Sequence, residues 1–174
     1  KSILVFRFSA LGDIAMTIPV LRSFFNTYPN QKITFVSRGF VEPLFKEFDN
    51  LEFVSVDFNN DYKGLKGLFK LFKLLRKKNI KAVADLHNVL RTKILKMFFK
   101  LVFIKVQSID KGRADRKKLT QKNNKKFKPL TPIHYRYCDV FGRLGFPIDL
   151  TNHEYPIKPF LPENSEEQKI LSKS

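Results

Sequence analysis

The stretch Ile3–Phe25, ILVFRFSALGDIAMTIPVLRSFF, decides the fold of this chain. It begins with a short apolar, β-branched run at residues 3–8, the pattern of a strand that is buried on both faces. A turn of small residues follows at 9–12, and Asp13 then opens an apolar-periodic segment with helical spacing. Strand, glycine turn, acidic residue and helix predict the opening of an α/β domain whose first turn faces a ligand. Because the turn has one glycine and no lysine, it is neither a dinucleotide-binding fingerprint nor a Walker loop.

The rest of the chain alternates strand patterns with helix patterns. Apolar runs predict strands at 32–37, 51–57, 81–86 and 101–107, and helical periodicity predicts helices at 41–48, 63–78, 89–99 and 133–144. This alternation indicates βαβ units, and therefore a doubly wound, mainly parallel, Rossmann-like α/β sheet with helices on both faces. We expect residues 1–150 to form this domain and residues 151–174, with their prolines and polar tail, to be a linker that leaves it.

The net charge of +17 is concentrated in the middle third of the chain. Residues 61–128 hold 22 Lys or Arg against 4 Asp or Glu, whereas residues 1–60 hold 6 of each. Such a density of positive charge indicates either an anionic partner (nucleic acid, a membrane face or a phosphorylated glycolipid) or a solvated lysine-rich surface. The segment 108–128 has no apolar period, and we expect a mobile loop there unless an anion holds it.

Cysteine content and hydropathy exclude two classes of protein, those stabilised by internal disulfides and those that this chain would anchor by a membrane-spanning helix. A single cysteine, Cys138, excludes a disulfide within this chain, fits a reducing compartment and is expected to be a core thiol on a helix. The most apolar run, 94–106, is too short and too rich in lysine to cross a membrane. Because His134 and His153 have no metal-ligand spacing with other residues, no metal site is expected.

Polar residues fall where the predicted strands end. In a doubly wound sheet, ligands bind outside the carboxyl ends of the strands, so these residues are expected to share one rim. They are Ser9 and Asp13 after the first strand, Ser37 and Arg38 after the second, Asp57 after the third, His87 and Asn88 after the fourth, and Asp110 after the fifth. Asp13 could act there as a general base, or it could simply be an acidic residue that the helix dipole favours.

The segment FRFSALGDIAMTIPVLRSF resembles the amino-terminal signature of the ADP-heptose:lipopolysaccharide heptosyltransferases, glycosyltransferase family nine. That signature is a strand, a Ser-Ser-x-Gly-Asp turn and a helix with Thr-x-Pro near its start; here Ala10 replaces the second serine. Three later motifs agree in order and spacing, and the resemblance covers about residues 2–150. These motifs are Asp85–Thr92, Lys111–Ala114, and His134–Arg136 leading to Leu144–Phe146.

The resemblance implies the amino-terminal, acceptor-binding half of a glycosyltransferase of the GT-B architecture. Such enzymes transfer heptose from ADP-heptose to the inner core of lipopolysaccharide, with inversion and without a metal or other cofactor. The donor would lie mostly in a carboxyl-terminal domain that this chain lacks, so we expect the chain alone to be inactive. By the same resemblance, Asp13 would be the general base that deprotonates the acceptor hydroxyl, and Gly12 would let the backbone approach the substrate.

The remaining predicted substrate contacts are mostly cationic. Arg91, Arg113 and Arg136 match basic family positions that contact acidic sugars or phosphates, a task that suits the bidentate guanidinium group. The set is completed by Ser9 in the first turn, His87 as a group that could orient a substrate hydroxyl, and Arg38 and Lys63 for their position near the rim.

Charge placement and family resemblance together predict a cytoplasmic protein that is peripheral to the inner membrane. A lysine stripe within 66–77 and the basic segment 108–128 suit contact with an anionic leaflet. Two alternatives remain: the same fold with a different nucleotide-sugar donor, and a non-enzymatic basic domain that binds nucleic acid. Against the second, the phenylalanines follow core-facing periods and no recognition-module signature is present, so no nucleic-acid partner is expected.

Overall fold

A computed structural model describes residues 1–112 and 131–151 of the chain. Its centre is a five-stranded sheet in the order β3-β2-β1-β4-β5, in which every neighbouring pair of strands is parallel. This confirms the predicted doubly wound parallel sheet. The strands are β1 (Ser2–Phe6), β2 (Lys32–Ser37), β3 (Leu51–Ser55), β4 (Ile80–Asp85) and β5 (Lys105–Ser108).

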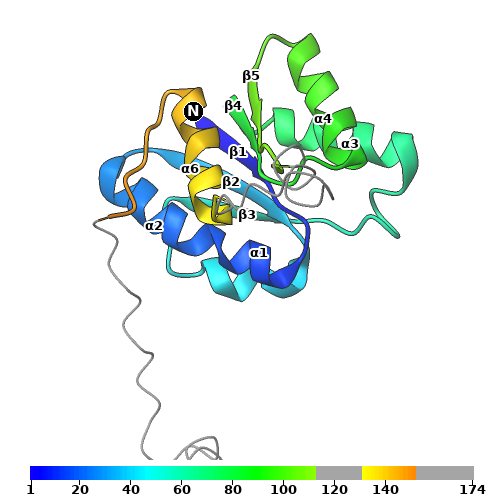
Figure 1. The fold of residues 1–174 in the computed structure, drawn as a ribbon. Coiled ribbons are helices and arrows are strands. Elements are labelled where there is room, and N and C mark those ends of the chain that lie inside the picture. The colour runs from blue at the N-terminus through cyan, green and yellow to red at the C-terminus, as the bar shows by residue number, and fades with distance from the viewer. Residues whose placement is uncertain (113–130, 152–174) are drawn as a thin grey trace, which may run out of the picture.

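Helices cover both faces of the sheet (Figure 1). One face carries α1 (Leu11–Ala15), α2 (Thr17–Thr27), the 3₁₀ helix η1 (Gly39–Phe45) and α6 (Ile133–Leu144). The other face carries α3 (Gly64–Arg76) and α4 (Leu90–Leu101). Each crossover between parallel strands therefore buries its apolar stripe against the sheet, as the alternation of patterns predicts.

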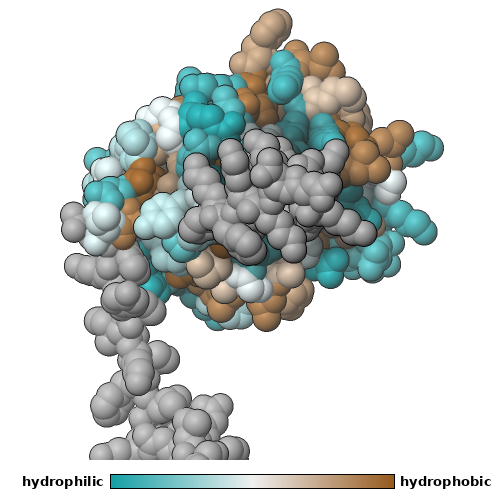
Figure 2. Space-filling view, viewed as in Figure 1, coloured by the Kyte–Doolittle hydropathy of each residue, from teal (hydrophilic) through white to brown (hydrophobic). Residues whose placement is uncertain are grey.

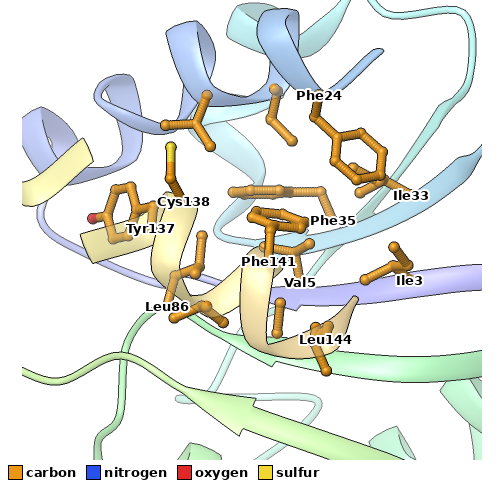
Figure 3. Close-up of a cluster of buried hydrophobic side chains, with 14 of the residues drawn as sticks. Ile3, Val5, Phe24, Ile33, Phe35, Leu86, Tyr137, Cys138, Phe141 and Leu144 are labelled. Atoms are coloured by element: carbon orange, nitrogen blue, oxygen red, sulfur yellow. The ribbon is translucent and has the colours of Figure 1, made fainter. Parts of the chain in front are cut away.

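The central strand β1 separates two hydrophobic cores. Ile3 and Val5 face the core under α2 and α6, and Leu4 and Phe6 face the core under α3 and α4. The first of these cores packs Phe24 of α2 against Phe141 of α6 (Figure 3). Full burial of such a side chain stabilises the fold by about 1.5–3 kcal/mol. Cys138 is buried in the same core, which confirms the expected core thiol.

Two predicted helices take a different form. The segment that Asp13 opens is not one helix, because it is interrupted at Met16 between α1 and α2. Pro19 lies in the first turn of α2, and since proline has no amide hydrogen, that position is favourable at the start of a helix and unfavourable inside one. The helix predicted at 41–48 is the 3₁₀ helix Gly39–Phe45, which contains Pro43.

The strand predicted at 101–107 is wrong in its first half. Helix α4 continues to Leu101, Phe103 lies in a turn with φ 59°, and β5 begins only at Lys105. The apolar run 101–106 suits a helix end and a strand equally well, so its composition could not locate the turn.

The predicted loop 108–128 and the predicted linker 151–174 lie mostly outside the described residues, and both stay predictions. No helix within residues 1–112 or 131–151 has the length and apolar character needed to cross a membrane.

Candidate functional site

A hollow of about 490 Å³ lies at the carboxyl edge of the sheet. Four segments that are distant in the sequence form it: the ends of three parallel strands, which all lie at the same edge, and the start of one helix. Its lining residues are Arg7, Ser9, Ala10 and Asp13 after β1, His87 after β4, Ile109 and Lys111 after β5, and Thr131, Ile133 and Arg136 around the start of α6.

The most buried charge of the hollow is Arg7, the first residue beyond β1, which is 5% exposed. Its Nη1 donates to the backbone carbonyl oxygen of Leu86 at 2.6 Å, and its Nη2 forms an ion pair with the carboxylate of Asp13. The guanidinium also lies 5.9 Å from the ring centroid of Tyr137. A buried cation requires a counter-charge, and Asp13 supplies it.

Asp13 is held from a second side by Tyr137. The tyrosine hydroxyl donates to the backbone carbonyl oxygen of Asp13 at 3.1 Å, while its ring is fully buried in the core of Figure 3. Burial raises the pKa of Tyr137 to about 12, so the hydroxyl keeps its proton and remains a donor. The Asp13 side chain is nevertheless 44% exposed. Its carboxylate is therefore oriented by buried groups and still open to the hollow.

Ser9 and His87 form a neutral pair beside this carboxylate. The backbone N–H of Phe8 donates to Nδ1 of His87 at 3.4 Å, which assigns the ring proton to Nε2. Nε2 lies 3.3 Å from Oγ of Ser9 and donates to it. Burial, helped by the charges of Arg7 and Lys111, lowers the pKa of His87 to about 4, so the ring is uncharged near neutral pH. The hydroxyl hydrogen of Ser9 is then available to a ligand.

A buried polar network holds the loop that presents His87. Asp85 is fully buried at the end of β4, and its Oδ1 accepts the backbone N–H groups of His87 at 3.1 Å and Asn88 at 2.8 Å. Its Oδ2 pairs with Nζ of Lys96 at 2.8 Å, and the same Nζ lies 2.6 Å from Oγ of Ser108 in β5. This network ties the ends of two neighbouring strands together and so sets the direction of the His87 loop.

Arg136 brings a second guanidinium to the hollow. Its Nε donates to the carbonyl oxygen of Thr131 at 2.9 Å and its Nη1 to that of Asp110 at 3.2 Å. Gly112 lies against it with φ 59°, and a Cβ at this position would collide with the guanidinium. The positive φ favours glycine at this position of the Lys-Gly-Arg motif, and any larger residue there would displace the Arg136 guanidinium.

The hollow gathers four of the predicted site residues and leaves others outside. Ser9, Asp13, His87 and Arg136 line it. Gly12 lies beside it in α1, and a Cβ added there would meet no atom of the described chain within 4 Å. Three other predicted residues do not line the hollow: Arg38 is exposed beyond β2, Lys63 immediately precedes α3, and Arg91 in α4 has its guanidinium 5.1 Å from the ring centroid of Phe58. Arg113 lies outside the described residues and stays a prediction.

Sequence reasoning missed Arg7 and Lys111 as site residues. Arg7 had a visible signal, because it is a lone cation between two phenylalanines at the end of a buried strand. Lys111 appeared only as part of a motif. Within residues 1–112 and 131–151, no three His, Cys, Asp or Glu side chains are grouped so that they could hold a metal ion.

Several solved structures share this fold. A family 9 glycosyltransferase from Veillonella parvula matches with a TM-score of 0.61 and 19% identity, over 99% of this chain and 48% of that chain. E. coli heptosyltransferase WaaC with ADP matches with a TM-score of 0.61 and 16% identity, over 89% of this chain and 51% of that chain. The chain has the fold of about half of a GT-B glycosyltransferase. E. coli ADP-heptose lipopolysaccharide heptosyltransferase II matches with a TM-score of 0.53 and 19% identity, over 99% of this chain and 49% of that chain.

The chain spans about half the length of the solved structures that it matches. No protein-family model and no curated protein sequence matches it. The likeness is therefore one of fold, and a shared fold does not by itself imply a shared reaction.

Proposed function

We propose that this chain is the acceptor-binding half of a glycosyltransferase that transfers heptose from ADP-heptose to the inner core of lipopolysaccharide. One observation carries the proposal: the open carboxylate of Asp13 is held by the buried Arg7 inside a hollow that also contains cationic groups. The fold comparisons support it, since the similar structures include heptosyltransferases, one of them solved with ADP-2-deoxy-2-fluoro heptose.

In this reaction Asp13 acts as the general base. It accepts the proton of the acceptor hydroxyl while the hydroxyl oxygen forms a bond to the anomeric carbon of the donor sugar. The bond between that carbon and the diphosphate oxygen breaks, and the nucleoside diphosphate leaves with the electron pair. Attack from the side opposite the leaving group inverts the anomeric configuration. In this proposal the reaction uses neither a metal ion nor a cofactor besides the nucleotide sugar.

The other polar groups of the hollow bind and orient the acceptor. Arg136 and Lys111 suit its carboxylate or phosphate groups, for which a guanidinium offers paired donors. Ser9, whose oxygen already accepts from the neutral His87, donates its hydroxyl hydrogen to a sugar oxygen.

The donor is bound mainly by a second domain, so the 174-residue chain by itself binds acceptor and turns over little. Since the acceptor is a membrane glycolipid, we expect the protein to work at the cytoplasmic leaflet of the inner membrane.

The arrangement favours an enzyme over a nucleic-acid-binding domain. Stacking on bases needs exposed aromatic rings, and most of the described phenylalanines are buried in the two cores. The exposed ones among the described residues are Phe40, Phe69 and Phe103. A different nucleotide-sugar donor fits the same hollow, because this half would not choose the donor.

The test is sugar transfer by the full-length protein, from ADP-heptose to a purified inner-core acceptor. We expect Asp13→Asn to lower turnover by about 10²- to 10⁴-fold and to keep acceptor binding. Asp139→Asn is the matched control, because it breaks an exposed pair with Arg143 on α6 that is not part of the hollow.

Each other outcome removes a different part of the proposal. Near-normal transfer by Asp13→Asn would remove the general-base role. Transfer from another nucleotide sugar, but not from ADP-heptose, would change the donor. Absence of transfer from every nucleotide sugar tested would overturn the assignment as a glycosyltransferase.

A further inference from the structure

The turn between α4 and β5 exposes a phenylalanine in an unfavourable backbone conformation. Phe103 is 98% exposed and has φ 59°. The other non-glycine residues with positive φ in the described segments are Asn79 and Asn88, and asparagine tolerates this conformation far better than a bulky residue does. Phe103 therefore has an unfavourable backbone conformation and, in water, an unfavourable side-chain environment, and it gains almost no packing in return.

Phe103 is not an isolated apolar residue. Met97 and Leu101 lie four residues apart on the outer face of α4 and are 53% and 69% exposed. They line a shallow hollow of about 440 Å³ together with the lysines at 93, 96 and 100. We call Met97, Leu101 and Phe103 the apolar tip. Figure 2 shows hydrophobic surface at the α4–β5 turn, directly beside hydrophilic surface.

The stretch of chain that carries the apolar tip is strongly basic. Residues 62–109 contain 13 Lys or Arg and a single acidic residue, Asp85, which is buried and paired with Lys96. Lys93, Lys100 and Lys105 are exposed near the tip on α4 and at the start of β5. No acidic side chain of this stretch is left at the surface to neutralise them.

We propose that the apolar tip inserts into an anionic lipid bilayer while the surrounding lysines contact the lipid headgroups. Exposed apolar side chains flanked by cations match the two layers that a protein meets at an anionic membrane, hydrocarbon and charged headgroup. Methionine and leucine do not stack on nucleobases, so lipid fits the tip better than nucleic acid does. The proposal deepens the proposed function by naming the surface that brings the protein to its membrane acceptor. It rests on the proposed function only in assuming that the acceptor lies in a membrane.

The position of the apolar tip sets the height of the hollow above the membrane. The tip precedes β5 and so lies at the amino edge of the sheet, whereas the hollow lies at the carboxyl edge. A strand of five residues spans about 17 Å. An anchored molecule would therefore hold its hollow away from the headgroups, where the sugars of a glycolipid reach it and its acyl chains do not.

The experiment measures binding of the 174-residue chain to vesicles of phosphatidylcholine with 30% phosphatidylglycerol, without any sugar substrate. We expect salt-sensitive binding that falls at least about tenfold in Phe103→Gly. Glycine relieves the positive φ, so this variant is expected to be at least as resistant to heat as the parent chain. Phe40→Ala, which removes an exposed phenylalanine from η1 on the other face, is the matched control and should bind normally.

Charge is tested with a second pair of variants. Lys93→Gln combined with Lys100→Gln should weaken binding by about fivefold per lysine. Arg38→Gln combined with Lys63→Gln, at exposed sites beyond the carboxyl ends of β2 and β3, should not. Since the chain contains no tryptophan, Phe103→Trp provides a unique probe whose emission shifts to the blue when the tip enters the bilayer.

Three results would overturn the proposal. The first is vesicle binding that does not change in Phe103→Gly or shows no shift in Phe103→Trp. The second is the absence of vesicle binding together with tight, salt-dependent binding to single-stranded RNA, which would assign the surface to nucleic acid. The third is a dimer that Phe103→Gly dissociates in sedimentation, which would assign the tip to a second copy of the chain. None of these results depends on sugar transfer, so the proposed function could fail or stand independently.

Discussion

Breaking the ion pair between Arg7 and Asp13 should destabilise the fold as well as stop the reaction. Asp13→Asn leaves the Arg7 guanidinium, whose side chain is 6% exposed, with the carbonyl oxygen of Leu86 as an uncharged partner at 2.6 Å. Removing one partner of a fully buried pair costs about 3–5 kcal/mol. Because the Asp13 side chain is 44% exposed, water can partly solvate Arg7 in place of the carboxylate, so we expect a smaller loss of stability. The expected decrease in the free energy of unfolding is about 1–3 kcal/mol.

The partner substitution reveals how much of this loss belongs to the pair. Arg7→Met removes the buried charge and should cost about 1–2 kcal/mol, since the Leu86 carbonyl loses its donor. In the double variant, the asparagine at position 13 no longer faces an unpaired cation. The combined loss should therefore be smaller than the sum of the single losses by about 1 kcal/mol or more.

The assay is urea unfolding of the 174-residue chain and its three variants at one pH. Losses that add to within about 0.5 kcal/mol would refute the reasoning, because they would mean that Arg7 does not depend on Asp13. The same measurement separates a loss of catalysis from a loss of folding. A loss of sugar transfer in Asp13→Asn is assigned to chemistry only at temperatures where the variant is still folded.

Two further predictions concern the same hollow. In the unfolded chain His87 has its ordinary pKa of 6.5, and in the fold burial lowers it to about 4, so the unfolded state binds more protons between these values. Stability should therefore fall as the pH drops from 6.5 to about 4, and His87→Asn should flatten this decline; equal slopes would contradict the assignment. Gly12→Ala meets no atom within 4 Å, so it should keep or raise stability by up to about 1 kcal/mol yet lower sugar transfer. Unchanged transfer would show that no substrate approaches the Gly12 backbone.

Sequence patterns determined the architecture of this protein. Continuous apolar runs identify strands that are buried on both faces, and their alternation with helical periods predicts a parallel sheet. Because parallel strands end at one edge, the same patterns predicted that Ser9, Asp13 and His87 would lie on one rim, and the structure places all three in the hollow.

The tertiary structure alone decided which rim residues meet. The sheet order β3-β2-β1-β4-β5 puts the segments after β2 and β3 on one side of β1 and those after β4 and β5 on the other. Arg38 and Lys63 therefore lie apart from the hollow, whereas Arg136 reaches it from α6. Periodicity reports which residues belong to a strand, and it carries no information on the order of the strands, since that order depends on contacts between distant segments. For the same reason, only the packed structure shows that the buried Arg7 pairs with Asp13 and that Phe103 remains exposed.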